Sequence, residues 1–206
     1  MKVELHLHTS RYSGCAANSP EEMMARLVAT GYEAVFITEH DAVWPAGEIA
    51  ELRKAFPAIG IFPGLEINIG QAWSMEHLLV LGTNDAGYLR LSGPEEILAK
   101  ARSEGHLTVL AHPCRWEGSG KMIGAALLPD ALEARTGNQD ACRAGLAEKL
   151  AGSLNLPAVN AGDAHSVNMI DQFWIETARP IAAPDDVRRI VLARAYVNCI
   201  NQRLRQ

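Results

Sequence analysis

Apolar residues recur along this chain in short runs, separated by longer segments in which apolar and polar positions follow a helical period. The short runs have the length and the Val, Ile and Leu content of buried strands. After a first strand that begins at Lys2, they lie at residues 34–38, 59–62, 76–82, 107–111, 130–134 and 157–161. Helices are predicted at residues 20–30, 45–56, 94–104 and 138–154 and after Asp185. Strands that alternate with helices pair in parallel, so we predict an α/β fold, and the chain length favours a compact barrel over an open sheet.

Two helix starts are marked by clear capping signals. Ser19 precedes Pro20 and Glu22, which is the pattern of a capping box with proline at the first helical position. Pro94 follows Gly93 and precedes two glutamates in the same way. Asn138 is the predicted cap of the helix at 138–154.

The first strand carries two histidines one residue apart, in the sequence VELHLHTS at residues 3–10. In a regular strand Val3, Leu5 and Leu7 line one face, and Glu4, His6 and His8 line the other. Both imidazoles then aim at the same point. Two water-bonded histidines on an edge strand are the alternative interpretation for an isolated pair of this kind.

Composition indicates an ordinary globular protein, with 48% hydrophobic and 21% charged residues among 206. This length predicts a single domain over residues 1–206. The apolar runs are too short to span a membrane, and no signal peptide precedes the first strand, so we expect no membrane association and a cytoplasmic location. The net charge of −5 argues against broad attraction to nucleic acid, although short or single-stranded substrates stay open.

Six of the seven histidines lie beside the carboxyl end of a predicted strand or within a strand, together with two carboxylates. These residues are His6, His8, His40, Glu66, His77, His112, Asp163 and His165. In a barrel of parallel strands the loops after the carboxyl ends converge on one face, so distant residues can share one pocket. His106 directly follows the turn residue Gly105, and we expect it at the surface or at a helix cap.

So many imidazoles in one cleft would repel one another if protonated and would lack partners if neutral. Divalent metal ions resolve both problems, because neutral imidazole and carboxylate are their common ligands. The sequence therefore predicts a site for several metal ions. Each motif alone is weak, since a single histidine is more often a hydrogen-bonded structural residue than a ligand.

The motifs HLHTS, ITEHD, PGLE, LAHP and GDAHS, in this order and spacing, resemble those of the PHP (polymerase and histidinol phosphatase) family. The resemblance implies a distorted seven-stranded (β/α) barrel, TIM-like, with two or three divalent ions (Mn, Fe or Zn) and phosphoesterase activity. The ligands that it implies are His6, His8, Glu66 and Asp163 for one metal, a bridging Glu66 with His77 and His112 for the second, and His40 with His165 for the third.

Two positions depart from the family pattern. Cys15 stands where many members have histidine or aspartate, so it is the candidate ligand of the third metal, and its thiolate would favour zinc or iron. A buried free thiol is the alternative. Glu39 stands where aspartate is commoner, and we expect it to orient a ring nitrogen from behind the ligands.

The expected function is hydrolysis of a phosphate ester of a small metabolite or nucleotide through a metal-bridging hydroxide. Asp163 or His165 would relay a proton to the leaving oxygen. Arg115, with Arg11 or Lys121, would bind the phosphate, and a solvated surface role is the alternative for each of these cations. Two other functions stay open, namely a metal-dependent hydrolase of amide or ester bonds and a metal-binding module without turnover.

Overall fold

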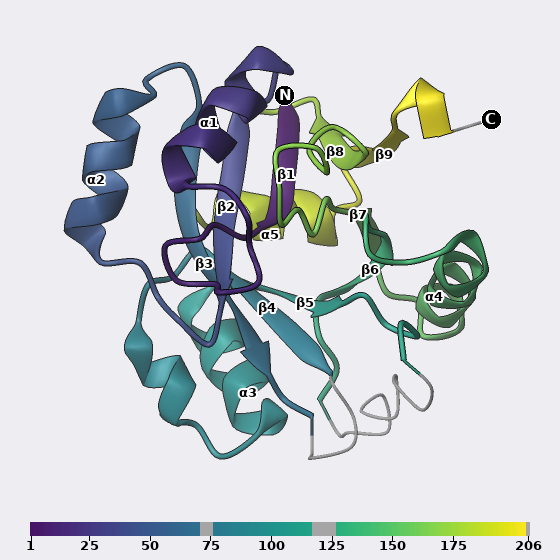
Figure 1. Ribbon diagram of the computed structural model, residues 1–206. Helices are drawn as coiled ribbons and strands as arrows, with labels where there is room; N and C mark the ends of the chain where they lie inside the picture. The colour runs from purple at the N-terminus through teal and green to yellow at the C-terminus, as the bar shows by residue number, and fades with distance from the viewer. Residues whose placement is uncertain (71–75, 117–126, 205–206) are drawn as a thin grey trace.

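The computed structural model describes residues 1–70, 76–116 and 127–204 (Figure 1). Its strands are β1 (Lys2–Leu7), β2 (Ala34–His40), β3 (Gly60–Asn68), β4 (His77–Leu81), β5 (Leu107–Ala111), β6 (Ala131–Arg135), β7 (Ala158–Asn160), β8 (Phe173–Thr177) and β9 (Tyr196–Ile200). Within the described residues these nine strands form one sheet, in the order β7-β6-β5-β4-β3-β2-β1-β8-β9.

The helices are α1 (Pro20–Ala29), α2 (Ala46–Ala55), α3 (Pro94–Glu104), α4 (Ala141–Ser153) and α5 (Asp186–Leu192), with short 3-10 helices at Ala86–Arg90 and Gln202–Leu204. The predicted capping box is confirmed: the Ser19 hydroxyl accepts from the Glu22 N–H at 3.3 Å, and the Glu22 carboxylate accepts from the Ser19 N–H at 2.8 Å. Figure 1 shows α1 and α2 on one side of the molecule and α4 on the other, beside β6 and β7. None of the helices within the described ranges combines the length and apolarity that a membrane crossing requires.

The predicted barrel of seven parallel strands is wrong in strand number and in direction. The sheet is mixed: β4 runs antiparallel to β3 and β5, and β8 runs antiparallel to β1 and β9. The connection from β3 to β4, residues 69–76, is shorter than the dozen or so residues that a parallel crossover needs. The other neighbouring pairs are parallel.

The two ends of the sheet, β7 and β9, approach each other and nearly close the barrel. Side chains make this junction, because no backbone ladder joins β7 to β9 in the part of the chain that the structure describes. The Asn160 N–H donates to Asn198 Oδ1 at 2.8 Å, and the Tyr196 hydroxyl donates to the Ala158 carbonyl at 2.8 Å. We call this junction the seam.

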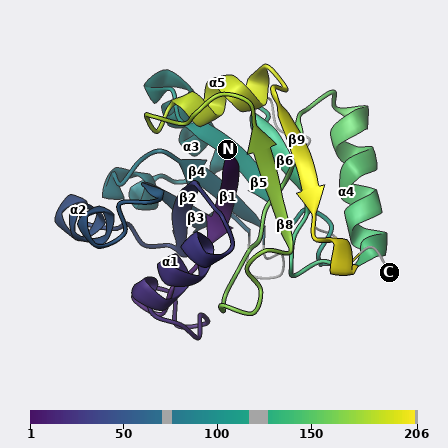
Figure 2. The same cartoon turned by 90° about the horizontal axis from the view of Figure 1, so that it is seen from above.

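The barrel interior holds an apolar cluster that α5 completes. Its larger members are Val3, Leu5, Phe36, Phe62, Leu79, Leu107, Val109, Val159, Val187 and Ile190. Val187 and Ile190 belong to α5, which lies across the top of the view in Figure 2 and packs against this cluster. These strand residues sit toward the amino ends of the parallel strands, which leaves the carboxyl ends for polar side chains.

A β-bulge changes the faces of β1. Val3 pairs with Ala34 and Leu7 pairs with Ile37, so β1 has one residue more than β2 over this stretch. The predicted common face of Val3, Leu5 and Leu7 is therefore wrong: Val3 and Leu5 join the interior cluster, whereas Leu7 packs outward with residues of α1 and α2. Bulges re-aim side chains next to functional sites. Here the bulge turns His6 toward the barrel interior.

Candidate metal centre

The structure brings the predicted histidines and carboxylates together at the carboxyl ends of the parallel strands. His6 and His8 come from the end of β1, His40 from the end of β2 and Glu66 from β3, and His112 follows β5. Asp163 and His165 follow β7. His77 is the first residue of β4 and reaches the same edge because β4 is antiparallel, which places His77 opposite Asn68 at the end of β3.

Four donor atoms converge to form the first group. His6 Nε2 and His8 Nε2 are 2.9 Å apart, and each lies 3.2 Å from Glu66 Oε2. Asp163 Oδ1 lies 3.4 Å from His6 Nε2 and 3.5 Å from His8 Nε2. Bonds of about 2.0–2.1 Å to a tetrahedral zinc ion place its ligands about 3.3 Å apart. The spacing of these donors therefore fits a metal ion at their centre.

The hydrogen bonds on the far side of each ring assign the tautomers. His6 Nδ1 donates to Glu133 Oε1 at 2.7 Å, because a carboxylate can only accept. The Ser13 hydroxyl donates to Glu39 Oε2 at 2.5 Å, so it accepts from His8 Nδ1 at 3.3 Å. Both rings consequently direct an Nε2 lone pair at the same point. Two facing lone pairs among carboxylate oxygens require a cation between them, either a proton or a metal ion.

Glu66 connects this first group to a second one. Its Oε1 lies 2.7 Å from His77 Nδ1 and 3.0 Å from His112 Nε2, while its Oε2 lies 2.9 Å from His40 Nδ1. Glu66 is fully buried, and its Oε2 has no hydrogen-bond partner among the described residues. A buried carboxylate oxygen of this kind, surrounded by imidazole nitrogens, fits a bridging metal ligand.

A third group consists of His8, His40 and His165, whose ligand atoms lie within 4.8 Å of one another. The His8 ring lies 4.3 Å from each of the other two, centroid to centroid. Cys15 is exposed and is not part of this group. Partial desolvation of its thiol, and then the nearby carboxylates, raise the pKa of that thiol. The assignment of Cys15 as a ligand stays a prediction.

Charges within the site shift the pKa values of its members in opposite directions. Burial alone would lower the pKa of His6, but the charges of Glu133 and Asp163 outweigh it and raise that pKa well above its ordinary value. Burial would raise the pKa of Glu66, yet the neighbouring imidazoles, His6 first, hold it well below its usual range. Metal binding at such a site displaces protons.

Asp163 is held in a strained conformation by its neighbours. Its φ is 48°, in the left-handed region that few residues other than glycine adopt. Asn138 Nδ2 donates to the Asp163 carbonyl at 2.9 Å and to its Oδ2 at 2.7 Å, which leaves Oδ1 facing the histidines. The prediction that Asn138 caps α4 is wrong, because Asp140 makes that cap by accepting from the Arg143 N–H at 2.8 Å.

Sequence reasoning missed two buried glutamates behind the ligands. Glu133 of β6 accepts from His6 Nδ1 and, through Oε2, from the His112 N–H at 2.6 Å, so it supports two ligands at once. Glu4 of β1 is also fully buried, and burial raises its pKa to about 7. A signal existed for both: each stands between two apolar residues of a strand, where a buried charged residue needs partners. Glu39 accepts from the Ser13 hydroxyl and from the Trp44 indole N–H, and it reaches His8 Nδ1 only through Ser13.

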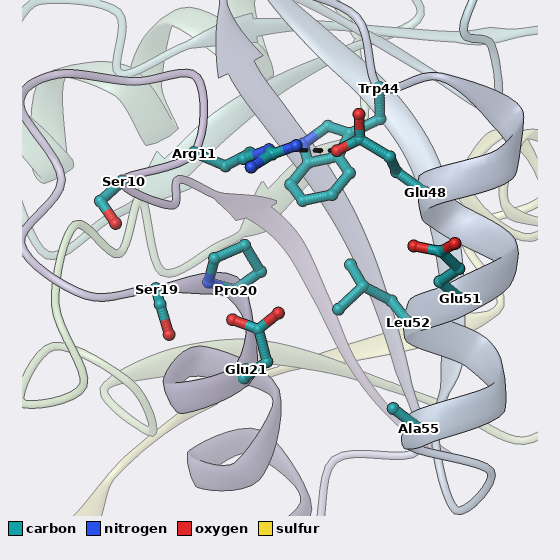
Figure 3. A pocket seen from close by; sticks show the side chains of 10 residues that line it. All are labelled: Ser10, Arg11, Ser19, Pro20, Glu21, Trp44, Glu48, Glu51, Leu52 and Ala55. Carbon is teal, nitrogen blue, oxygen red and sulfur yellow. Dashed lines mark hydrogen bonds and ion pairs between the residues drawn. The ribbon is translucent and has the colours of Figure 1, made fainter.

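The predicted phosphate-binding cations lie in different places. The Arg115 guanidinium lies over the Trp116 ring, 4.6 Å from its centroid, and its Nη1 is 3.6 Å from Asp163 Oδ2 at the edge of the metal centre. Arg11 instead pairs with Glu48 at 3.1 Å (Figure 3). Lys121 lies outside the described residues.

Arg11 belongs to a separate cavity of about 600 Å³ between α1 and α2, which Trp44 and three glutamates help to line.

His106 was expected at the surface or at a helix cap. It follows Gly105, the residue that caps the carboxyl end of α3, and lies near Glu104 and away from the other six histidines.

Two family models match the chain. Residues 4–107 match the PHP domain, and residues 144–196 match the model described as PHP-associated. The error-prone DNA polymerase of Mycobacterium bovis is 32% identical over 97 residues, and that of Cutibacterium acnes is 31% identical over 98 residues. Each match covers 44% of this chain but 9% of the polymerase, so the chain corresponds to a small part of these relatives.

Solved structures share the fold at low sequence identity. A two-domain protein from Bacteroides vulgatus that contains a predicted PHP-like metal-dependent phosphoesterase has a TM-score of 0.74 and 15% identity, over 98% of this chain and 65% of that one. An amidohydrolase from Chromobacterium violaceum, solved with bound sulfate and no metal, has a TM-score of 0.67 and 15% identity, over 96% and 98% of the two chains. At this identity the likeness concerns the fold alone.

Proposed function

The chain belongs to the PHP domain family, and from that premise we propose that it is a metal-dependent phosphoesterase acting on a small phosphorylated metabolite or a nucleotide. The single observation that supports this most strongly is the position of His6 Nε2 and His8 Nε2. These two atoms lie 2.9 Å apart and face the same two carboxylate oxygens, Glu66 Oε2 and Asp163 Oδ1. Such a donor set holds a divalent cation.

Bound divalent ions would supply two things, a hydroxide nucleophile near neutral pH and neutralisation of the charge on the phosphoryl oxygens. The chain itself supplies placement. Glu133 and Ser13 fix the rings of His6 and His8, and Glu66 spans the donor groups, so the geometry exists before substrate arrives. Preorganised ligands of this kind avoid reorganisation during the reaction.

Of the two candidate cations that the structure describes, Arg115 is better placed than Arg11 to bind a substrate phosphate. Its side chain is 31% exposed, and its guanidinium lies over the Trp116 ring and borders Asp163, so it combines access to solvent with a fixed orientation. A guanidinium can bind two phosphate oxygens at once. Arg11 is less suited to this role because Glu48 already neutralises it.

His165 is better placed than Asp163 to transfer a proton to the leaving oxygen. Its Nδ1 donates to the Asp163 carbonyl at 3.0 Å, which leaves Nε2 for proton exchange when the third group holds no ion, and its side chain is 20% exposed. Asp163 is almost fully buried, and Asn138 holds its outer oxygen. Proton transfer requires a group within reach of the substrate, so we assign this role to His165.

A small substrate agrees with the charge of the chain. Its net charge of −5 does not favour broad binding to a nucleic-acid backbone, which supports a metabolite or a mononucleotide over a long polymer.

Hydrolysis of a generic phosphomonoester and a generic phosphodiester, by protein loaded with manganese, iron or zinc, tests the proposal. We expect turnover that is lost on chelation and in His6→Ala. His106→Ala is the matched control, because it removes a histidine outside the metal centre and should leave turnover unchanged.

Turnover that survives both chelation and His6→Ala would refute the proposal. Metal-loaded protein that cleaves amides or carboxylic esters but no phosphate ester would establish the alternative hydrolase. Metal-loaded protein that cleaves neither would support the metal-binding module without turnover.

A further inference from the structure

One buried carboxylate, that of Glu4, connects the two chain segments that carry His6 and Asp163 of the first donor group. Glu4 Oε1 accepts from the His6 N–H at 3.0 Å and from the Gly162 N–H at 2.7 Å. His6 lies in the bulged part of β1, where regular pairing with β2 is interrupted, and Gly162 immediately precedes Asp163. Glu4 thus joins a donor at the start of the chain to a donor more than 150 residues later.

The contact between Glu4 and Gly162 leaves no room for a side chain. A Cβ atom on Gly162 would lie 2.5 Å from Glu4 Oε2, which is far inside van der Waals contact. The other side of the same residue is held as well, because the Gly162 carbonyl accepts from the Gly137 N–H at 2.9 Å. The backbone that presents Asp163 is therefore fixed from both sides, and one of these supports is Glu4.

This arrangement sets the spacing of the donors. Asp163 Oδ1 lies 3.4 Å from His6 Nε2. The backbone of His6 bonds directly to Glu4 Oε1, and the backbone of Asp163 is held at the same oxygen through its neighbour Gly162. Without that oxygen, two buried backbone N–H groups would lose their acceptor, and the segments could separate.

We propose that Glu4 is a positioning residue that fixes the distance between the β1 ligands and Asp163 and thereby sets the metal affinity of the group His6, His8 and Asp163. The proposal rests on the proposed function only in requiring that this group holds a metal ion. Glu4 itself contacts neither the metal position nor the substrate.

Two substitutions separate hydrogen bonding from space filling. Glu4→Gln keeps an acceptor oxygen, whereas Glu4→Met keeps a long unbranched side chain but has no oxygen. We expect Glu4→Gln to bind Co²⁺ and Zn²⁺ nearly as the wild type does, and Glu4→Met to bind them about ten- to a hundredfold more weakly. The visible absorption of bound Co²⁺, which reports ligand geometry, should change in Glu4→Met and not in Glu4→Gln.

Glu33→Met is the matched control. Glu33 also accepts from a backbone N–H of β1, that of Lys2 at 2.9 Å, but at the end of the strand away from the donors. Its replacement should leave the metal affinity unchanged. If Glu4→Met does not fold, Gly162→Ala decides the matter, because its methyl group should displace the Glu4 carboxylate and weaken metal binding in the same way.

Equal metal affinity in Glu4→Met and wild type would overturn the proposal, and so would an equal loss in Glu4→Gln and Glu4→Met. Metal titration keeps this test separate from that of the function. Wild-type protein that binds Co²⁺ but hydrolyses no phosphate ester would refute the phosphoesterase and leave the role of Glu4 to be judged on affinity. Wild-type protein that binds no ion at this group would overturn both.

Discussion

Replacing Glu133 by glutamine should weaken metal binding and fold stability together. Both oxygens of Glu133 accept hydrogen bonds, from His6 Nδ1 at 2.7 Å and from the His112 N–H at 2.6 Å. An amide has one acceptor oxygen, so either orientation of glutamine turns an NH₂ group toward a buried donor. One unpaired buried N–H costs about 1–3 kcal/mol, and we expect the metal-free protein to lose that much unfolding free energy.

The metal affinity of Glu133→Gln should fall about ten- to a hundredfold, because the carboxylate that orients His6 also raises the basicity of its Nε2. Denaturant unfolding of chelated protein measures the first effect, and competition with a chromogenic chelator for Zn²⁺ measures the second. Glu148→Gln is the control. Glu148 is an exposed residue of α4 that pairs with Arg135, which lies in β6 as Glu133 does, and such surface pairs contribute at most about 1 kcal/mol. Zinc affinity within twofold of wild type in Glu133→Gln would refute the reasoning.

Three further outcomes follow from the same structure. Arg115→Ala should lower kcat/KM for a phosphate ester about ten- to a hundredfold through KM, with metal content unchanged; unaltered kinetics would remove Arg115 from substrate binding. If Cys15 is a ligand, Cys15→Ser should bind one metal ion fewer by elemental analysis, and an unchanged count would exclude it. Burial lowers the pKa of His106 below 6.5. The contribution of neutral His106 to the free energy of unfolding is therefore fully present above pH 6.5 and is lost as the pH falls below that value. Unfolding free energies should therefore decline less in His106→Gln than in wild type between about pH 7.5 and about pH 5.5; parallel declines would contradict this assignment.

The parts of the fold that depend on local sequence were predictable. The capping box at Ser19, the helix after Pro94 and the apolar strands at 34–38 and 107–111 depend on neighbouring residues, and the structure has all of them. Strand β8 was missed because its apolar run, Phe173–Ile175, is only three residues long, and only Ile175 of that run is buried.

Strand direction and face could not be predicted in the same way. The antiparallel course of β4 follows from the short connection between Asn68 and His77. The expected strand ended at residue 62, and the connection from there to residue 76 is long enough for a parallel crossover. The bulge in β1 depends on pairing with β2, which the sequence of β1 alone does not contain.

The clustering of the candidate ligands was easier to predict than the barrel around them. The ligands reach the same rim of the barrel whichever way their strands run. His77 lies at the amino end of the antiparallel strand β4, and that end lies beside the carboxyl end of β3. The supporting residues were harder to predict, because Glu133 and Asn138 act through partners far along the chain. Their roles depend on tertiary contacts, and a residue type alone indicates only that a partner is needed.

The seam between β7 and β9 has a consequence for how the molecule opens. Strand β7 is three residues long, and side chains such as Asn198 and Tyr196 join it to β9 in place of a backbone ladder. Amide protons along this junction should be among the first strand protons to exchange with deuterium. Asp163 follows β7 by three positions, so an ion held between Asp163 and β1 would tie the strand beside the seam to the opposite end of the chain. Metal loading should then slow deuterium uptake at the seam, although no ligand lies within it.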